Sequence, residues 1–236
     1  MPKRIALVED EKAIRENYAD ALRRHGYDVA AYTARDDSLA AFRKRLPDLA
    51  IIDIGLGEEV EGGFEVCREL RGMSPTVPII FLTARDSDFD TISGLRLGAD
   101  DYLTKDVSLP HILARVAALF RRLDALQLQH ARDQLHVVNE LSIDKNCMVV
   151  EWRGNKVDLT LTEFWIVHSL TQVPGHVKSR DQLMKDANIF VDDGTVTSHV
   201  KRIRRKFETL DASFDCIDTV YGVGYRWNVK PAANHK

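Results

Sequence analysis

Short apolar runs alternate with stretches of helical spacing in the first half of the chain. The apolar runs are IALV at 5–8, DVAAY at 28–32, LAIIDI at 49–54, VPIIFLTA at 77–84 and DDYLT at 100–104. The intervening stretches have the spacing of amphipathic helices, as over 11–26, where Gly26 suits the position just after a helix. Strands that alternate with helices predict an α/β doubly wound domain with a five-stranded parallel sheet over residues 1–122.

A different pattern begins after residue 122. Residues 123–138 are polar and rich in glutamine, and we interpret them as a linker. The predicted strands that follow are 141–152, 156–159, 216–220 and 225–229, and the predicted helices are 160–172, 179–188 and 195–210. Two of these helices start with a capping-box pattern, TLTE at 160–163 and SRDQ at 179–182. The pattern predicts an α+β winged helix-turn-helix domain over 139–230, followed by a tail at 231–236.

Length and charge support this division without indicating a partner. The chain has 236 residues, which favours two domains. Its net charge is −3, and the parts before and after residue 122 carry 18 Lys+Arg against 21 Asp+Glu and 15 against 15. A nucleic-acid site must therefore be a local basic patch. There is no membrane-spanning run and no signal-peptide pattern, and the three cysteines are scattered, which predicts a cytoplasmic protein.

Polar side chains follow the predicted strands at the points where they end. Glu9 and Asp10 follow the first strand, Asp53 the third, Thr83 the fourth and Lys105 the fifth. The carboxyl ends of parallel strands meet at one edge of the sheet, so these groups are expected to converge there. Three acids in a small space repel one another, and a hard cation such as Mg²⁺ relieves that repulsion. The sequence therefore predicts a magnesium site with a reactive Asp53.

The motifs resemble those of the response regulators of the OmpR/PhoB family over almost the whole chain. They are ALVEDE at 6–11, IIDIGL at 51–56, LTAR at 82–85, GADDYLTK at 98–105, LTLTEF at 159–164, SRDQL at 179–183, TVTSHVKRIRRKF at 195–207 and IDTVYGVGYRW at 217–227. The resemblance implies a flavodoxin-like receiver domain joined to a winged helix-turn-helix. It implies a transcription regulator controlled by a sensor histidine kinase.

The resemblance also implies roles for the residues at the edge of the receiver sheet. Asp53 would accept a phosphoryl group, and Mg²⁺ would be held by Glu9, Asp10, Asp53 and the carbonyl of Gly55. The residues that bind the phosphoryl group or switch with it would be Thr83, Ala84, Tyr102 and Lys105. Two features depart from the family: Asp106 replaces the usual proline, and the loop after Asp53 is longer and acidic. We expect the first to affect how Lys105 is placed, and the second to be solvated or to tune the choice of kinase.

Phosphorylation in this family remodels a dimer face on the fourth helix, fifth strand and fifth helix. The residues that match this face are Ile92, Leu95, Asp101, Ala114 and Arg115, with Asp101 and Arg115 paired across the dimer. The family's other two ion pairs are missing. The positions of one pair are occupied by Thr91 and His111, and those of the other by Arg96 and Ala117. The resemblance therefore predicts a homodimer that depends less on charge.

The helix predicted at 195–210 has a basic surface opposite an apolar stripe. Val196, Val200, Ile203 and Phe207 form the stripe, and five lysines and arginines lie between 201 and 206. The resemblance implies that this helix enters the major groove of double-stranded DNA. Arg202 would contact base edges, and the other DNA-facing positions would be His199, Lys201, Arg204, Arg205, Thr219, Tyr221 and Tyr225.

Three departures weaken the expected DNA contacts. Tyr221 replaces an arginine of the wing, Asn188 replaces a tryptophan, and Gly194 replaces another arginine. The loop before the last helix, which would contact RNA polymerase, is also short and acidic. An alternative is therefore a regulator that acts mainly through protein partners. A phosphatase with an aspartate nucleophile is disfavoured, because the acid/base position two residues after Asp53 is Gly55, which cannot transfer protons. We predict a protein without enzymatic activity of its own.

Overall fold

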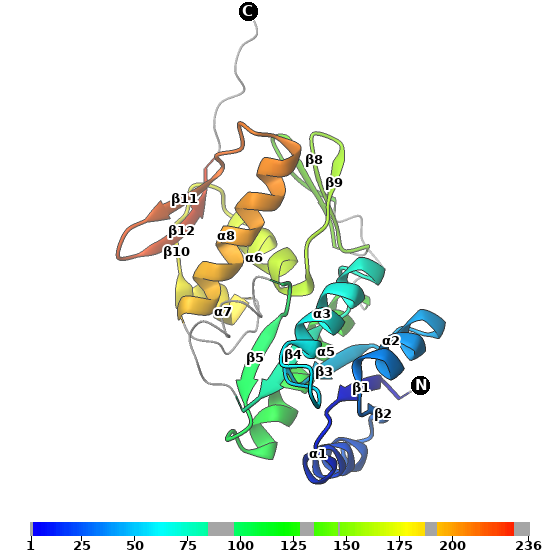
Figure 1. The fold of residues 1–236 in the computed structure, drawn as a ribbon. Coiled ribbons are helices and arrows are strands. Elements are labelled where there is room, and N and C mark those ends of the chain that lie inside the picture. The colour runs from blue at the N-terminus through cyan, green and yellow to red at the C-terminus, as the bar shows by residue number, and fades with distance from the viewer. Residues whose placement is uncertain (1, 85–96, 128–134, 146, 187–192, 229–236) are drawn as a thin grey trace, which may run out of the picture. The chain divides into compact units, whose positions relative to one another are not determined.

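The computed structural model describes residues 2–84, 97–127, 135–145, 147–186 and 193–228 (Figure 1). The chain divides into two compact units, Met1–Ala117 and Ala118–Lys236. The division lies inside a helix and five residues before the predicted boundary at 122. No helix in the described ranges has the length and hydrophobicity needed to cross a membrane.

The first unit is built on a five-stranded parallel sheet, as the alternating pattern predicts, and the structure gives the strand order β2-β1-β3-β4-β5. Its strands are β1 (Arg4–Val8), β2 (Asp28–Tyr32), β3 (Leu49–Ile52), β4 (Ile79–Thr83) and β5 (Asp101–Thr104). Its described helices are α1 (Lys12–Arg24), α2 (Arg35–Lys44), α3 (Gly62–Met73) and α5 (Leu109–Gln127), the last of which runs on into the second unit. All four residues of β3 are buried, which explains why this strand is a continuous apolar run.

The switch from β3 to β1 to β2 places the ends of the first and third strands beside each other. Backbone hydrogen bonds continue the ladder past the strands, from the N–H of Asp53 to the carbonyl of Val8 at 2.9 Å. The amide of Glu9 donates in the same way to the carbonyl of Tyr32 at 3.0 Å. The acids that follow β1 and β3 are therefore held by the sheet itself.

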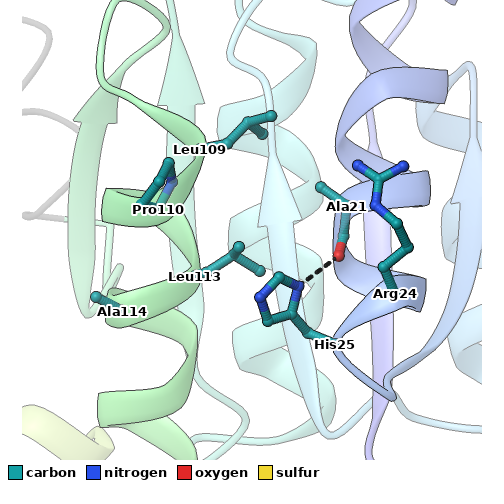
Figure 2. A pocket seen from close by; sticks show the side chains of 7 residues that line it. All are labelled: Ala21, Arg24, His25, Leu109, Pro110, Leu113 and Ala114. Atoms are coloured by element: carbon teal, nitrogen blue, oxygen red, sulfur yellow. Dashed lines mark hydrogen bonds between the residues drawn. The ribbon is translucent and has the colours of Figure 1, made fainter.

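Two helices of this unit also border a shallow apolar groove. Its volume is about 590 Å³, and Figure 2 shows side chains from α1 on one side and α5 on the other. His25 closes the α1 side, where its Nδ1 lies 2.9 Å from the carbonyl oxygen of Ala21.

The described part of the second unit contains two antiparallel sheets and, besides the end of α5, three helices. One sheet has the order β6-β7-β8-β9, from β6 (Leu135–Val138), β7 (Leu141–Asp144), β8 (Val149–Trp152) and β9 (Asn155–Val157). The other has the order β10-β12-β11, from β10 (Lys178–Ser179), β11 (Ile217–Val220) and β12 (Gly224–Trp227). The helices are α6 (Leu161–Thr171), α7 (Arg180–Asp186) and α8 (Asp193–Leu210). In Figure 1, α8 lies beside the β11–β12 hairpin.

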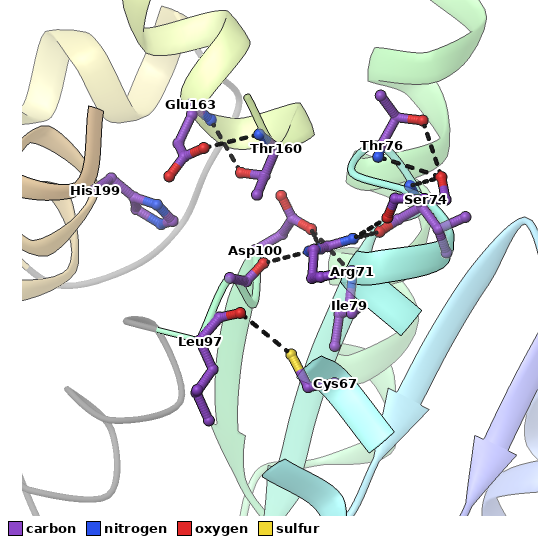
Figure 3. A network of polar contacts seen from close by, with 12 residues as sticks. Cys67, Arg71, Ser74, Thr76, Ile79, Leu97, Asp100, Thr160, Glu163 and His199 are labelled. Carbon is purple, nitrogen blue, oxygen red and sulfur yellow. Dashed lines mark hydrogen bonds and ion pairs between the residues drawn. The ribbon is translucent and has the colours of Figure 1, made fainter. Parts of the chain in front are cut away.

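One predicted boundary is wrong. Residues 135–138 belong to the predicted linker, but they form β6 and pair with β7 along its whole length. Both predicted capping boxes are confirmed: the side chain and backbone of Thr160 and Glu163 bond reciprocally (Figure 3), and Ser179 and Gln182 do the same. The core of this unit includes an aromatic cluster in which the rings of Phe207 and Phe214 stack with centroids 4.5 Å apart.

A buried histidine makes the stability of the second unit depend on pH. Burial lowers the pKa of His168 from 6.5 to about 4, with smaller contributions from nearby charges such as Lys145. The unfolded chain therefore binds this proton more readily, and stability is lost as the pH falls from 6.5 towards 4. We expect the wild type to lose about 2 kcal/mol of unfolding free energy at about pH 5 through this group, and His168→Phe to lose much less.

Tryptophan fluorescence during urea unfolding measures this effect selectively, because Trp152, Trp165 and Trp227 are the only tryptophans and all lie in the second unit. Equal losses of stability in the wild type and His168→Phe between neutral and mildly acidic pH would contradict the assignment.

Candidate functional site

The acids that follow β1 and β3 converge as the sequence predicts. Glu9, Asp10 and Asp53 each offer a carboxylate oxygen, and these oxygens lie within 4.8 Å of one another. Glu9 is 1% exposed and Asp53 8%, whereas Asp10 is exposed. The group thus combines two buried acids, Glu9 and Asp53, with one acid that is open to solvent, Asp10. Oxygen donors of this kind fit a hard divalent cation that keeps part of its water shell.

Lys105 completes the cluster from the end of β5. Its ammonium nitrogen lies 2.7 Å from Glu9 Oε2 and 2.7 Å from Asp53 Oδ2. The change from proline to Asp106 does not keep this lysine away from the acids, and the described chain contains no cis peptide bond. Asp106 accepts a hydrogen bond from the Thr104 hydroxyl, which ties the loop back to β5.

The charges at this edge shift the pKa of two groups. Burial raises the pKa of Glu9, Lys105 opposes that rise, and the charge of Asp53 adds to it. Burial alone would lower the pKa of Lys105, but its hydrogen bonds to Asp53 and Glu9 raise it instead. The lysine thus stays charged, while a buried acid is held beside another acid. The cluster contains three carboxylates and one ammonium, so a cation can still be bound by the excess negative charge.

Removing the lysine charge tests this balance. We expect Lys105→Met to lower the unfolding free energy of the first unit by about 2 kcal/mol without Mg²⁺, because two partly buried acids lose their counter-charge. Added Mg²⁺ should recover more stability in the variant than in the wild type, since the metal replaces the lost cation. Thermal unfolding with and without the metal measures both effects. A variant as stable as the wild type in the absence of metal would contradict the role of Lys105.

The long loop after Asp53 is a folded turn. Leu56 and Glu59 exchange backbone hydrogen bonds of 3.0 and 3.1 Å, with Gly57 at φ 64° between them. The Gly57 amide donates to Asp10 Oδ2 at 3.0 Å, so the turn orients the exposed acid of the cluster. Glu59 also pairs with Arg35 of α2 at 3.2 Å. The acidic loop is therefore held by two contacts, one with Asp10 of the cluster and one with Arg35 of α2.

A glycine that the sequence analysis did not identify permits this geometry. Gly63 is the second residue of α3, and its amide donates to the carbonyl of Ile54 at 2.8 Å. A Cβ on Gly63 would lie 1.9 Å from the carbonyl oxygen of Asp53. The helix and the acid-bearing loop are thus in direct backbone contact. The Gly62–Gly63 pair after the acidic loop is the only sequence signal for it.

The two aspartates before Tyr102 have different surroundings. Asp100 is 1% exposed, pairs with Arg71 at 2.8 Å and accepts the Ile79 amide at 3.0 Å, which fixes the starts of β4 and β5 (Figure 3). Asp101 lies 3.5 Å from Arg115 of the same chain. This contact lies within the single chain, and the pair across a dimer that the resemblance implies stays a prediction. The ring of Tyr102 is half-buried and lies 6.3 Å from that of Phe81.

Part of the predicted receiver site falls beyond what the structure describes. Ile92 and Leu95 lie outside the described residues. The backbone of Thr83 ends β4, but its side chain also lies outside them. Ala84 is exposed directly after β4, and Ala114 is exposed on α5. Gly55 follows Asp53 by two residues, and its metal-binding carbonyl remains a prediction.

The positions predicted to contact DNA fall into two groups. Lys201, Arg205 and Tyr221 are exposed, and Tyr221 reaches 93% at the tip of the β11–β12 hairpin. The others are engaged within the domain or buried. Arg202 pairs with Glu163 at 2.6 Å, Arg204 donates to Thr219 Oγ1 at 2.8 Å, the Tyr225 hydroxyl donates to Thr197 at 3.2 Å, and His199 is 0% exposed.

The other two departures from the family are at Gly194 and Asn188. Gly194 is in the first turn of α8, and Asn188 lies outside the described residues. At the hairpin, Gly222 has φ 75°, which lets the tip turn and present Tyr221. The hairpin is thus a wing whose tip offers an aromatic ring where the family has a cation.

Comparisons with known proteins agree with this geometry. Residues 5–117 match the family described as response regulator receiver domain, and residues 154–227 the family described as transcriptional regulatory protein, C terminal. The transcriptional regulatory protein BaeR of Escherichia coli O6:H1 is 39% identical over 228 residues, which cover 95% of this chain and 92% of that protein. AfsQ1 of Streptomyces coelicolor, also a transcriptional regulatory protein, is 37% identical over 94% of this chain and 96% of its own.

Solved structures show the same two-domain fold. A RitR mutant superimposes with a TM-score of 0.78 over 97% of this chain and 100% of its own, at 22% identity, which compares the fold alone. The response regulator DrrB of Thermotoga maritima, an OmpR/PhoB homolog, is 28% identical over the same shares with a TM-score of 0.52. The chain belongs to the OmpR/PhoB family of response regulators, non-enzymatic transcription regulators with a receiver domain and a winged helix-turn-helix DNA-binding domain.

Proposed function

We propose that this response regulator is phosphorylated on Asp53 by a sensor histidine kinase in the cytoplasm, and that phosphorylation controls its binding to DNA. The observation that carries the proposal is the convergence of Asp53 with Glu9, Asp10 and Lys105 at one edge of the sheet. Asp53 is mostly buried but touches solvent, so its carboxylate is accessible at the edge.

The side chains divide the work of phosphoryl transfer. One carboxylate oxygen of Asp53 would attack the phosphorus of a phosphohistidine as its P–N bond breaks, and the imidazole of the kinase would leave. The other oxygen would stay with the cation site. Glu9, Asp10, Asp53 and the Gly55 carbonyl would hold Mg²⁺, which supplies charge stabilisation to the transferred group. Lys105 would move from Asp53 to the new phosphoryl oxygens and neutralise them, and Thr83 and the Ala84 backbone would bond to them. Phosphoryl transfer needs chiefly this positioning and electrostatic stabilisation.

The added charge would then change the packing of Tyr102, near the start of β5. A phosphoryl group brings about −2 charge beside Lys105. We infer that Thr83 turns towards it and that Tyr102, now half-buried beside Phe81, rotates inward. This is a change between two packing arrangements of the kind that switches use.

A homodimer would follow, formed through the fourth helix, β5 and α5. Because Asp101 already pairs with Arg115 of its own chain, a pair across the dimer requires an exchange of partners. The dimer should therefore depend mainly on the apolar residues Ile92, Leu95 and Ala114. Sedimentation of the phosphorylated protein at low and high salt tests this, since dissociation at high salt would contradict it.

The dimer would place two winged helices on double-stranded DNA, where they also meet RNA polymerase. We assign the receiver domain to 1–122 and the DNA-binding domain to 139–230, with β6 joined to the latter. Lys201, Arg205 and Tyr221 are exposed and available for DNA. Electrophoretic shift of genomic fragments, with and without beryllofluoride as a phosphoryl mimic, tests DNA control against an action through protein partners alone.

A further inference from the structure

Four cations of α8 lie on two different sides of the helix. Lys201 and Arg205, one turn apart, are exposed, and Thr197 precedes them on the same ridge. Arg202 and Lys206, also one turn apart, face α6 instead. The helix therefore offers DNA fewer cations than its sequence suggests.

Glu163 is what holds the second pair. Its carboxylate is buried, with Oε1 2.6 Å from Arg202 Nε and Oε2 2.6 Å from Lys206 Nζ. The same carboxylate accepts the Thr160 amide at 2.8 Å and so closes the capping box of α6. Arg202 is bound a second time, by His199 Nδ1 at 3.0 Å from Nη2, and its side chain is 11% exposed.

The energetics favour keeping Arg202 in this place when DNA binds. Moving the guanidinium into the major groove would leave Glu163 buried with one counter-charge fewer. Breaking a buried ion pair by removing one partner costs more than a single arginine–guanine contact returns. Base edges are contacted mainly from the N-terminal part of a recognition helix, and Lys201, which is exposed, is the first cation of α8 along the chain.

We propose that Glu163 is a positioning residue that keeps Arg202 away from DNA, and that Lys201 contacts the base edges in its place. This rests on the proposed DNA binding and changes which residue determines specificity. The family's usual base-reading position is then an internal anchor between α6 and α8. Glu163 itself does not contact DNA in this proposal, and it affects binding only through Arg202.

The test is selection from a pool of randomised DNA duplexes by the full-length protein activated with beryllofluoride. Arg202→Met should retain the base preference of the wild type, and Lys201→Met should lose it at one base pair. Glu163→Gln keeps the capping box, because glutamine serves at that position, but it releases Arg202. This variant should bind more tightly and steepen the slope of log affinity against log salt by about 0.9, one additional contact.

The double variant Glu163→Gln/Arg202→Met should lose that gain, while Lys206→Met, which removes the other cation from Glu163, should not produce it. Thermal midpoints of each variant separate loss of fold from loss of contact. If Arg202→Met erases a base preference at an unchanged midpoint, or Glu163→Gln leaves both affinity and salt slope unchanged, the inference is overturned and DNA binding stands. If neither the wild type nor Glu163→Gln binds any duplex, the proposed function falls with it.

Discussion

Asp53→Asn should abolish phosphorylation of the protein by acetyl phosphate or a histidine kinase. The side-chain amide cannot form the acyl phosphate, and it removes one of the three carboxylates grouped at the edge of the sheet. The remaining acids, Glu9 and Asp10, should not replace it, because Glu9 is 1% exposed and the Gly57 amide holds Asp10. Intact-protein mass spectrometry after treatment with the phosphodonor and Mg²⁺ measures the phosphorylated fraction.

Asp28→Asn is the matched control for this experiment. Asp28 is an exposed aspartate at the start of β2, the opposite end of the sheet from the acid cluster. This variant should be phosphorylated to the same extent as the wild type. Persistent phosphorylation of Asp53→Asn at the wild-type level would show that another residue is the acceptor.

Gly63→Ala should lower the unfolding free energy of the first unit by more than about 4 kcal/mol, a loss that few single substitutions cause. The added Cβ would lie 1.9 Å from the carbonyl oxygen of Asp53, and backbone on both sides must move to make room. That movement also displaces the phosphoacceptor, so the fraction still folded should phosphorylate more slowly. Far-ultraviolet circular dichroism during thermal unfolding measures the loss.

Gly72→Ala is the control, on the same helix. A Cβ at Gly72 would meet nothing within 4 Å, and alanine favours the helix, so this variant should gain up to about 1 kcal/mol. Tryptophan fluorescence, which reports only the second unit, should give the wild-type transition in both variants. Equal midpoints for Gly63→Ala and the wild type would contradict the backbone contact.

Local pattern was sufficient to predict the receiver fold and the acid cluster. Polar residues end or follow four strands of the first unit, at Glu9, Asp53, Thr83 and Lys105, and parallel strands bring their carboxyl ends together. The convergence of Glu9, Asp10, Asp53 and Lys105 thus follows from the parallel arrangement of the strands. Strand β6 could not be predicted in this way, because LHVV at 135–138 follows a polar stretch and becomes a strand only by pairing with β7.

The partners of charged side chains could not be predicted from spacing. Glu163 and Arg202 are 39 residues apart, and only the packing of α8 on α6 brings them together. Asp101 and Arg115 also lie 3.5 Å apart within the chain, a contact that spacing did not predict, and their pairing across a dimer stays a prediction. A helical pattern identifies which side of α8 is apolar, but not which of its cations a buried acid retains.

Phosphorylation of Asp53 is proposed to control DNA binding, and the effect of a phosphoryl mimic on DNA affinity measures this control. The affinity of the wild type for a selected DNA fragment is measured by fluorescence anisotropy with and without beryllofluoride and Mg²⁺, beside Asp53→Asn under the same conditions. We predict tighter binding on activation in the wild type and no change in the variant. An equal gain in both proteins, or none in the wild type, would contradict the account.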